Sequence, residues 1–567
     1  MKEKIIYEIL SRRLFLRFVL VFSLFLFFIT LLFTNIGEPE PSVLWYMSEL
    51  FWTFWIGIII SIFGILLSIK EKYRLEGFLG VFIPLLYLYS LPSYAHEMVV
   101  VFDVYHVIPP ALDIIKTGTV NLKSIEFPFS HIYYASNMMV LDLNGLHYAR
   151  LFPTILSSLI VLFIYTVSRR ISKNYALLTP LIFLSLNWYM EYHMCRQAFG
   201  VMLWTAFWIT FFLFIERKNY RLGLLSSLLL ISLIPSHPGI LIIVSFNLAA
   251  LTFILFVSLR DKDEGWSYLK YSIPVIVVYA VSFLLLYMFV PNINQFITTM
   301  YDQVILGGFK GFSLGGPSRT SLQYGWVNKL RMAAGAFQSI VGLMGLYVLY
   351  KQDSKRSFVL GAWFLSCYLW LFYSLTHKGF LIERSFLTAL IPSSILIPSI
   401  IEYFKPKKVR LRKFTKASII VIMITFLLIV PITKNSIDTI ETPTDQAFQA
   451  GRFAQKNFEN RVFITDTHQG MFRYLESTSN SSVYFRARTR GHGEYFENGM
   501  TFGYPIPRTD DPSLPKILFV DYINNYFQVR YGDDKVVKEI ERYEKEVSNN
   551  SSNIYSSGDA NIYFNTS

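Results

Sequence analysis

The chain has 567 residues, of which 53% are hydrophobic and only 16% are charged. Soluble globular proteins carry about 25% charged residues, so this composition excludes an ordinary soluble domain and predicts a polytopic α-helical membrane protein. The net charge of +13 lies largely in short loops between apolar runs, and it therefore indicates membrane topology rather than a nucleic-acid partner.

Apolar runs long enough to cross a bilayer recur from the N-terminus onward. The first follows Lys2, Lys4, Arg12 and Arg13 and lacks a small-residue cleavage site, so we expect it to stay as a helix rather than to be removed as a signal peptide. The runs predict about thirteen transmembrane helices near residues 14–34, 50–69, 75–92, 148–167, 175–190, 198–215, 222–235, 239–258, 271–290, 329–350, 357–375, 386–403 and 417–433.

The loops between these runs alternate in charge. Lys and Arg gather in every second loop, on the side of the N-terminus, most densely in "KPKKVRLRK" at 405–413. The positive-inside rule makes this side cytoplasmic. We therefore expect a multi-pass protein of the cell membrane with a cytoplasmic N-terminus and an extracytoplasmic C-terminus. The outside loops 93–147 and 291–328 are long and partly apolar, which predicts helices that lie on the membrane surface.

After Pro431 the sequence becomes polar. Strand-like "RVFITD", "SSVYF" and "KILFVDY" alternate with helix-like "DQAFQAGRFAQKNFE" and "DKVVKEIERYEKE". This alternation predicts a small extracytoplasmic α/β domain over residues 434–567. The two cysteines, Cys195 and Cys367, belong to no metal-ligand cluster, so we expect neither a disulfide framework nor structural zinc.

The predicted outside face collects ionisable residues at helix ends. Charges at membrane edges are costly and often functional, and cations are otherwise scarce on this side. The residues are Asp103, His106, His131, His193, Arg196, His237, Lys378, Glu383 and Arg384. An acid beside guanidinium and ammonium groups at this depth suits a reaction on a lipid-linked phosphate, with a general base opposite a phosphate clamp.

Each of these residues also has a structural interpretation. Asp103 could cap a helix, and His106, one turn later, could be a packing residue rather than a partner of the acid. Arg196, Arg384 and Lys378 could extend to lipid headgroups. His131 and His193 are possible substrate contacts. His237 could shape a turn between two prolines, and Glu383 could pair with the neighbouring arginine.

Three segments resemble the first outside loop and following helices of the GT-C membrane glycosyltransferases. These are "FDVYHVIPPALDIIKTGTV", "FPFSHIYYASNMMV" and "HYARLFPTILSSLIVLFIYTVSRRI", with "EYHMCRQAFG" and "ERSFLTALIPSSIL" similar to later Arg-bearing turns of the family. The resemblance implies a GT-C-like core over 75–433, preceded by two additional helices within 1–74. It also implies that Asp103 is the catalytic base and that the donor is a sugar on a polyprenyl, expected to be dolichyl, phosphate.

Two features depart from the family pattern. Many relatives have an Asp-Glu pair in the first loop, whereas Val104 follows Asp103 here, and the W-W-D-Y-G motif of the oligosaccharyltransferase branch is absent. The resemblance therefore implies a monophosphate-linked donor with a single sugar or a short glycan. It implies no metal or other cofactor, with a divalent metal at Asp103 and the nearby histidines left open.

The sequence thus predicts an inverting glycosyltransferase whose acceptor is a protein, lipid or glycan at the outer face. Asp103, assisted by His106, would act on the acceptor, and Arg196, Arg384 and Lys378 would hold the lipid phosphate. A transporter or flippase is the main alternative, although no paired halves with interrupted helices are evident. The missing second acid leaves a non-catalytic binder of lipid-linked sugar as a third possibility.

Overall fold

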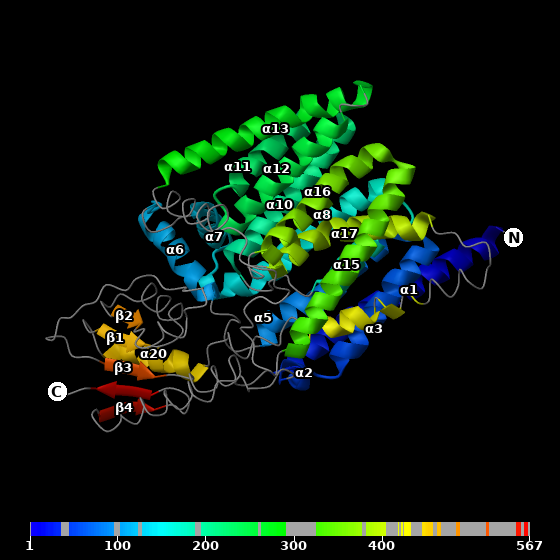
Figure 1. Ribbon diagram of the computed structural model, residues 1–567. Helices are drawn as coiled ribbons and strands as arrows, with labels where there is room; N and C mark the ends of the chain where they lie inside the picture. The colour runs from blue at the N-terminus through cyan, green and yellow to red at the C-terminus, as the bar shows by residue number, and fades with distance from the viewer. Residues whose placement is uncertain are drawn as a thin grey trace.

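The computed structural model describes residues 2–35, 45–95, 103–122, 127–187, 194–258, 262–290, 325–376, 382–403, parts of 418–431, 445–457 and five strands (Figure 1). Its helices are α1 (Lys2–Phe33), α2 (Trp45–Glu49), α3 (Thr53–Glu71), α4 (Arg74–Leu85), the π-helical η1 (Leu86–Ser90), α5 (Leu91–Ala95), α6 (Asp103–Thr117), α7 (Pro128–Leu141), α8 (Gly145–Ile171), α9 (Leu178–Leu186), α10 (Arg196–Arg217), α11 (Tyr220–Leu233), α12 (Pro238–Ser258), α13 (Lys262–Phe289), α15 (Gly325–Gln352), α16 (Ser354–Thr376), α17 (Ile382–Tyr403) and α20 (Asp445–Asn457).

Most of these helices are apolar enough for a membrane. Within the described residues, 7 are long and apolar enough to cross a bilayer, and four shorter apolar helices accompany them. The chain is therefore a multi-pass membrane protein, as its composition predicts. Every predicted apolar run overlaps a helix, including α9 and the helical residues 424–431. The count of thirteen crossings stays a prediction.

The first helix is joined to α4 by a buried carboxylate. Glu76 accepts hydrogen bonds from Arg13 Nε at 2.5 Å and from Arg17 Nη2 at 3.0 Å, and its side chain is only 8% exposed. A carboxylate at this depth needs such partners because burying an unpaired charge is expensive. This contact docks α1 on the helices that follow it, and the expected domain boundary at residue 74 stays a prediction.

Helices α15 and α17 pack closely along one face through small residues. A side chain at Gly335 would meet the Phe386 ring at 2.5 Å, and one at Gly345 would meet the Leu396 carbonyl oxygen at 2.6 Å. Both pairs have the same offset in sequence, so the two helices run parallel. Close contact of this kind supplies the van der Waals attraction that holds membrane helices together, and it fixes where α17 begins.

A polar cluster lies inside the apolar bundle, between α10, α12 and α16. The Asn247 carbonyl oxygen accepts from Trp204 Nε1 at 2.6 Å and from Trp208 Nε1 at 2.7 Å, and its amide donates to the Ser366 hydroxyl. Asn247 is fully buried. Because buried donors have no water to bond, one side chain satisfies two indoles and sets the relative position of three helices.

Replacement of Asn247 by leucine is expected to destabilise the protein by about 2–5 kcal/mol, since two buried indole N–H groups lose their acceptor. Leucine has a similar volume, so a cavity would not explain the loss. The midpoint of thermal unfolding in detergent should fall. An unchanged midpoint would show that the cluster does not hold these helices together.

The C-terminal part contains a five-stranded sheet. Its strands are β1 (Val462–Thr465), β2 (Tyr484–Ala487), β3 (Ile517–Val520), β4 (Ser552–Ser556) and β5 (Asn561–Phe564), in the order β2-β1-β3-β5-β4. The first three run parallel, and β5 is antiparallel to both β3 and β4. Figure 1 shows the sheet and α20 at the edge of the helical bundle, below α6 and far from the start of α1.

The three segments predicted as strands contain or overlap β1, β2 and β3, and α20 lies in a segment predicted as a helix. The second predicted helix, residues 534–546, lies outside the described residues. The division of the chain at 434 stays a prediction.

Candidate functional site

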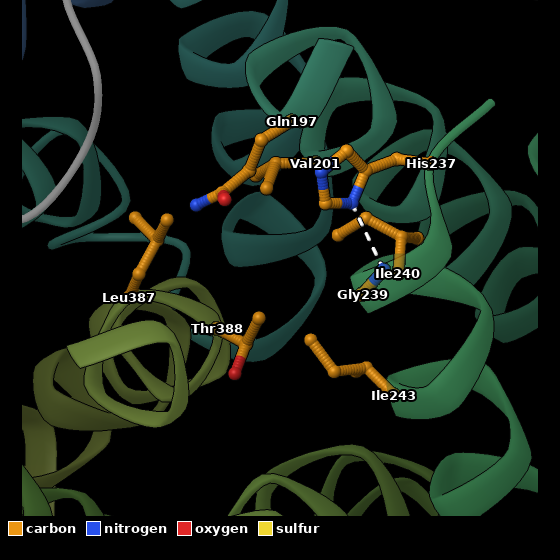
Figure 2. Close-up of a pocket in the computed structure, with 8 residues that line it drawn as sticks. All are labelled: Gln197, Val201, His237, Gly239, Ile240, Ile243, Leu387 and Thr388. Atoms are coloured by element: carbon orange, nitrogen blue, oxygen red, sulfur yellow. Dashed lines mark hydrogen bonds between the residues drawn. The ribbon is translucent and has the colours of Figure 1, made fainter. Parts of the chain in front are cut away.

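A pocket lies where α10, α12 and α17 begin. The space between its lining atoms is about 200 Å³, including solvent that it opens to, and the cavity proper has room for about one group the size of a water molecule. Its lining residues are Gln197, Val201, His237, Gly239, Ile240, Ile243, Leu387 and Thr388 (Figure 2). Backbone N–H groups at the start of a helix have no partner within the helix and carry partial positive charge. The pocket lies beside the first turns of α10 and α12 and the second turn of α17.

Local sequence explains why α10 and α12 approach each other here. Gly200 lacks a side chain where one would meet Ile240 at 2.8 Å and the Cβ of His237 at 3.3 Å. The Cys195 thiol caps α10 by accepting from the Ala198 N–H at 3.3 Å. His237 Nδ1 accepts from the Gly239 N–H at 3.0 Å, so its ring both caps α12 and lines the pocket. The structure thus supports the turn-shaping role of His237 and also places it at the site.

Arg196 is the first residue of α10 and precedes the pocket residue Gln197. A cation at a helix N-terminus opposes the helix dipole, and the side chain is half-buried. Among the described residues, Arg196 forms no ion pair or hydrogen bond. An uncompensated cation in this position is poorly placed for stability alone. It is well placed to bind an anion that approaches the pocket from the membrane surface.

The first turn of α17 brings two predicted residues to the same region. Arg384 lies one helical turn before Thr388, which lines the pocket, and Glu383 precedes it. The side chains of Glu383 and Arg384 lie outside the described residues. The parallel packing of α15 and α17 sets Arg331 level with this turn, and Arg331 is only 6% exposed. Arg331 is therefore a buried cation level with the start of α17.

Helices α6 and α7 cover the end of the bundle beside the pocket. His131 Nδ1 lies 3.2 Å from the Val107 carbonyl oxygen and donates to it, which joins α7 to α6. The Tyr134 hydroxyl donates to the Cys195 carbonyl oxygen at 2.8 Å, directly before Arg196. Asp103 is the first residue of α6, one turn before Val107, and His106 follows in the same turn. The side chains of Asp103 and His106 lie outside the described residues.

His131 is 4% exposed, and its environment keeps it neutral. Burial, and then the charge of Arg196, lower its pKa from 6.5 to about 3. Because the unfolded imidazole binds a proton below about pH 6.5 and the folded one does not, the stability contributed by neutral His131 is complete above that pH. It is lost progressively as the pH falls towards 3.

Replacement of His131 by glutamine should therefore make folding stability less sensitive to acid. Between about pH 6 and 4 the slope should fall by up to about 1.4 kcal/mol per pH unit. Chemical unfolding at a series of pH values measures this slope. His147, an exposed histidine in α8, provides the control variant His147→Gln. An equal slope in wild type and His131→Gln would contradict the prediction.

The remaining predicted residues and groups are placed as follows. His193 and Lys378 lie outside the described residues, as does the loop 291–324. Cys195 and Cys367 are separate buried thiols, without a disulfide between them. Within the described part of the chain, no three His, Cys, Asp or Glu side chains gather at one point. The expectation that no metal is needed stays a prediction.

Sequence reasoning did not select Gln197, Thr388 or Arg331. Gln197 and Thr388 line the pocket, and Arg331 is buried beside the start of α17. The sequence does carry one signal for Gln197, because a second polar residue follows Arg196 at the start of a long apolar run. Thr388 has no such signal, because hydroxyl side chains are common in membrane helices, where they can bond their own backbone.

No family model matches the chain, and no curated protein does so. Solved structures do. ArnT from Cupriavidus metallidurans in the apo state has a TM-score of 0.54 at 11% identity, covering 88% of this chain and 98% of that one. The same protein bound to undecaprenyl phosphate has a TM-score of 0.53 at 10% identity, covering 86% and 97%.

An oligosaccharyltransferase from Archaeoglobus fulgidus, tethered to an acceptor peptide that contains the NVT sequon, is similar to the same degree. Its TM-score is 0.53 at 11% identity, and the match covers 88% of this chain and 75% of that one. These identities are low, so the likeness concerns the fold. It extends over most of the chain and agrees with the resemblance in the first outside loop. The chain shares the fold of ArnT and of this oligosaccharyltransferase.

Proposed function

We propose that the protein is an integral-membrane glycosyltransferase that takes a sugar from a polyprenyl phosphate and transfers it to an acceptor at the extracytoplasmic face. One observation carries the proposal: Arg196, half-buried and without an anionic partner in the described structure, directly precedes Gln197, which lines a pocket between α10, α12 and α17. The similar structures include ArnT bound to undecaprenyl phosphate. A lipid phosphate at the membrane edge is the anion that this arrangement suits.

The mechanism is a single displacement. Asp103 accepts the proton of an acceptor hydroxyl, and the hydroxyl oxygen forms a bond to the anomeric carbon. The bond from that carbon to the phosphate oxygen breaks, and its electron pair leaves with the polyprenyl phosphate. Arg196 and Arg384 stabilise the charge of this leaving group, and one displacement inverts the anomeric centre. The hydrogen bond from His131 to Val107 connects the helix of Asp103 with the α7–α10 contact at Arg196.

The charge distribution favours this function over transport. Transporters place their binding residues near the middle of the membrane, between repeated halves. Here Asp103, Arg196 and Arg384 each lie in the first turn of a helix, and all three belong to loops predicted to lie outside. In this proposal the C-terminal region is extracytoplasmic and contributes to acceptor binding.

The test is sugar transfer by the purified protein in lipid nanodiscs. A panel of polyprenyl-phosphate hexoses and pentoses is supplied with a native membrane extract as acceptor, and labelled product is measured with and without EDTA. Transfer from at least one donor, unaffected by EDTA, is the expected result. Donor binding without product would favour the non-catalytic binder. Movement of lipid or solute across vesicles without any transfer would favour the transporter.

A further inference from the structure

Gln197 is the one lining residue of the pocket whose polar side chain is buried without a partner. It is 7% exposed, and its carbonyl oxygen Oε1 has no hydrogen-bond partner among the described residues. Figure 2 shows its amide reaching into the space between α10 and Leu387 of α17. A carbonyl oxygen that is buried away from water without a new hydrogen bond lowers the stability of the folded protein. Because Gln197 lines a pocket, a ligand that donates a hydrogen bond could complete this acceptor.

The hydrogen-bonding capacity of Gln197 Oε1 indicates which part of a ligand it would bind. A carbonyl oxygen can only accept a hydrogen bond. A phosphodiester also presents only acceptors, so the phosphate cannot donate a hydrogen bond to Gln197 Oε1. A sugar hydroxyl has a proton to donate, and the innermost pocket takes a group of that size. Arg196, the residue proposed to bind the phosphate, directly precedes Gln197 at the start of α10, so a sugar attached to that phosphate would lie near the pocket.

His237 gives the same pocket a second polar edge. Its Nδ1 accepts the Gly239 N–H, so the neutral ring carries its proton on Nε2. In Figure 2 that nitrogen lies on the side of Val201, towards α10. The other lining residues close to it, Ile240 and Ile243, are apolar and keep water away. A buried acceptor surrounded by apolar residues discriminates strongly between a sugar that has the hydroxyl and an analogue that lacks it.

We propose that this pocket is the subsite for one ring hydroxyl of the donor sugar, which donates its hydrogen bond to Gln197 Oε1. The inference rests on the proposed function, because it requires a lipid-linked sugar at Arg196. Gln197 is then a specificity residue: it selects donors that carry a hydroxyl at one ring position. Its Oε1 makes no contribution to binding the polyprenyl phosphate itself, which has no proton to donate.

The test compares the preferred donor with its monodeoxy analogues in wild type, Gln197→Leu and Gln197→Glu. Wild type should transfer one of the analogues at least about 10-fold more slowly than the parent sugar. In Gln197→Leu this ratio should approach one, because the acceptor oxygen is gone. Gln197→Glu keeps an oxygen at the same reach and should keep the discrimination. Gln197→Met, which is also unbranched, serves if the leucine variant is unstable.

Two further measurements separate this role from a structural one. Affinity for sugar-free undecaprenyl phosphate should be the same in wild type and Gln197→Leu. The midpoint of thermal unfolding without ligand should rise in Gln197→Leu, because an unsatisfied polar group is removed. Ser226→Ala is the matched control: Ser226 is buried in α11 with an unpartnered hydroxyl, outside the pocket. It should stabilise the protein without changing donor selectivity.

Two results would overturn the proposal. Discrimination by Gln197→Leu equal to that of wild type would show that the hydroxyl is read elsewhere. A loss of affinity for sugar-free undecaprenyl phosphate in Gln197→Leu would show that the pocket takes the phosphate. The failure of the wider function is distinct from both, since wild type would then transfer sugar from none of the donors.

Discussion

Replacement of Asp103 by asparagine is expected to slow sugar transfer by about 10²- to 10⁴-fold, the range lost when a general base is removed. Asparagine is similar in size and keeps an acceptor oxygen, but it cannot take the proton of the attacking hydroxyl. Donor affinity should stay within about twofold of wild type, because the proposed base acts on the acceptor. Initial rates and binding of a labelled donor are measured side by side.

Helix α6 offers a matched control for this variant. Asp113 lies in the same helix with an exposed side chain, and Asp113→Asn should transfer at the wild-type rate. If Asp103→Asn also transfers at that rate, Asp103 only favours the start of α6. In that case the substitution would cost at most a few tenths of a kcal/mol, since asparagine caps a helix as well as aspartate. The proposed mechanism would then need another base.

Replacement of Arg196 by methionine is the second change with a large expected effect. Transfer should slow by about 10²- to 10³-fold, because charge on the leaving phosphate loses a fixed cation in a region poor in water. Affinity for undecaprenyl phosphate should fall as well, since the product carries the same charge. Arg196→Lys should recover part of both losses, because lysine supplies the charge without the forked donors of arginine.

The control for Arg196 lies at the other end of the same helix. Arg217 is in the last turn of α10, where a cation is favoured by the dipole, and Arg217→Met should affect stability more than transfer. Wild-type transfer and phosphate affinity in Arg196→Met would contradict the proposed clamp. Arg384→Met would then be the next variant, because Arg384 lies in the first turn of α17, one turn before Thr388.

The helices of this protein were predictable because their cause is local. A run of apolar residues in a membrane must satisfy its backbone internally, and it does so as a helix. Helices α8, α10 and α13 lie where such runs were found. Their ends were less certain: α13 begins at Lys262, before its apolar run, because polar residues also form helix once the chain leaves the membrane.

The pocket was not predictable, because it depends on contacts between distant parts of the chain. The sequence singled out Arg196 and His237 separately, as charged or polar residues at helix ends. Nothing in it indicates that Gly200 lets α12 approach α10, or that Thr388 of α17 faces the same space. Gln197 was missed for a related reason. A glutamine at a helix start is common, and only its burial without a partner makes it informative.

The most direct test of the account is an electron cryo-microscopy structure of the protein in nanodiscs with undecaprenyl phosphate. We expect the phosphate at the mouth of the pocket, within hydrogen-bonding distance of Arg196, with the lipid chain extending between helices into the membrane. The Gln197 pocket should contain no part of the phosphate. A phosphate bound elsewhere, away from the first turns of α10 and α17, would contradict the central claim that Arg196 and Arg384 hold the lipid phosphate.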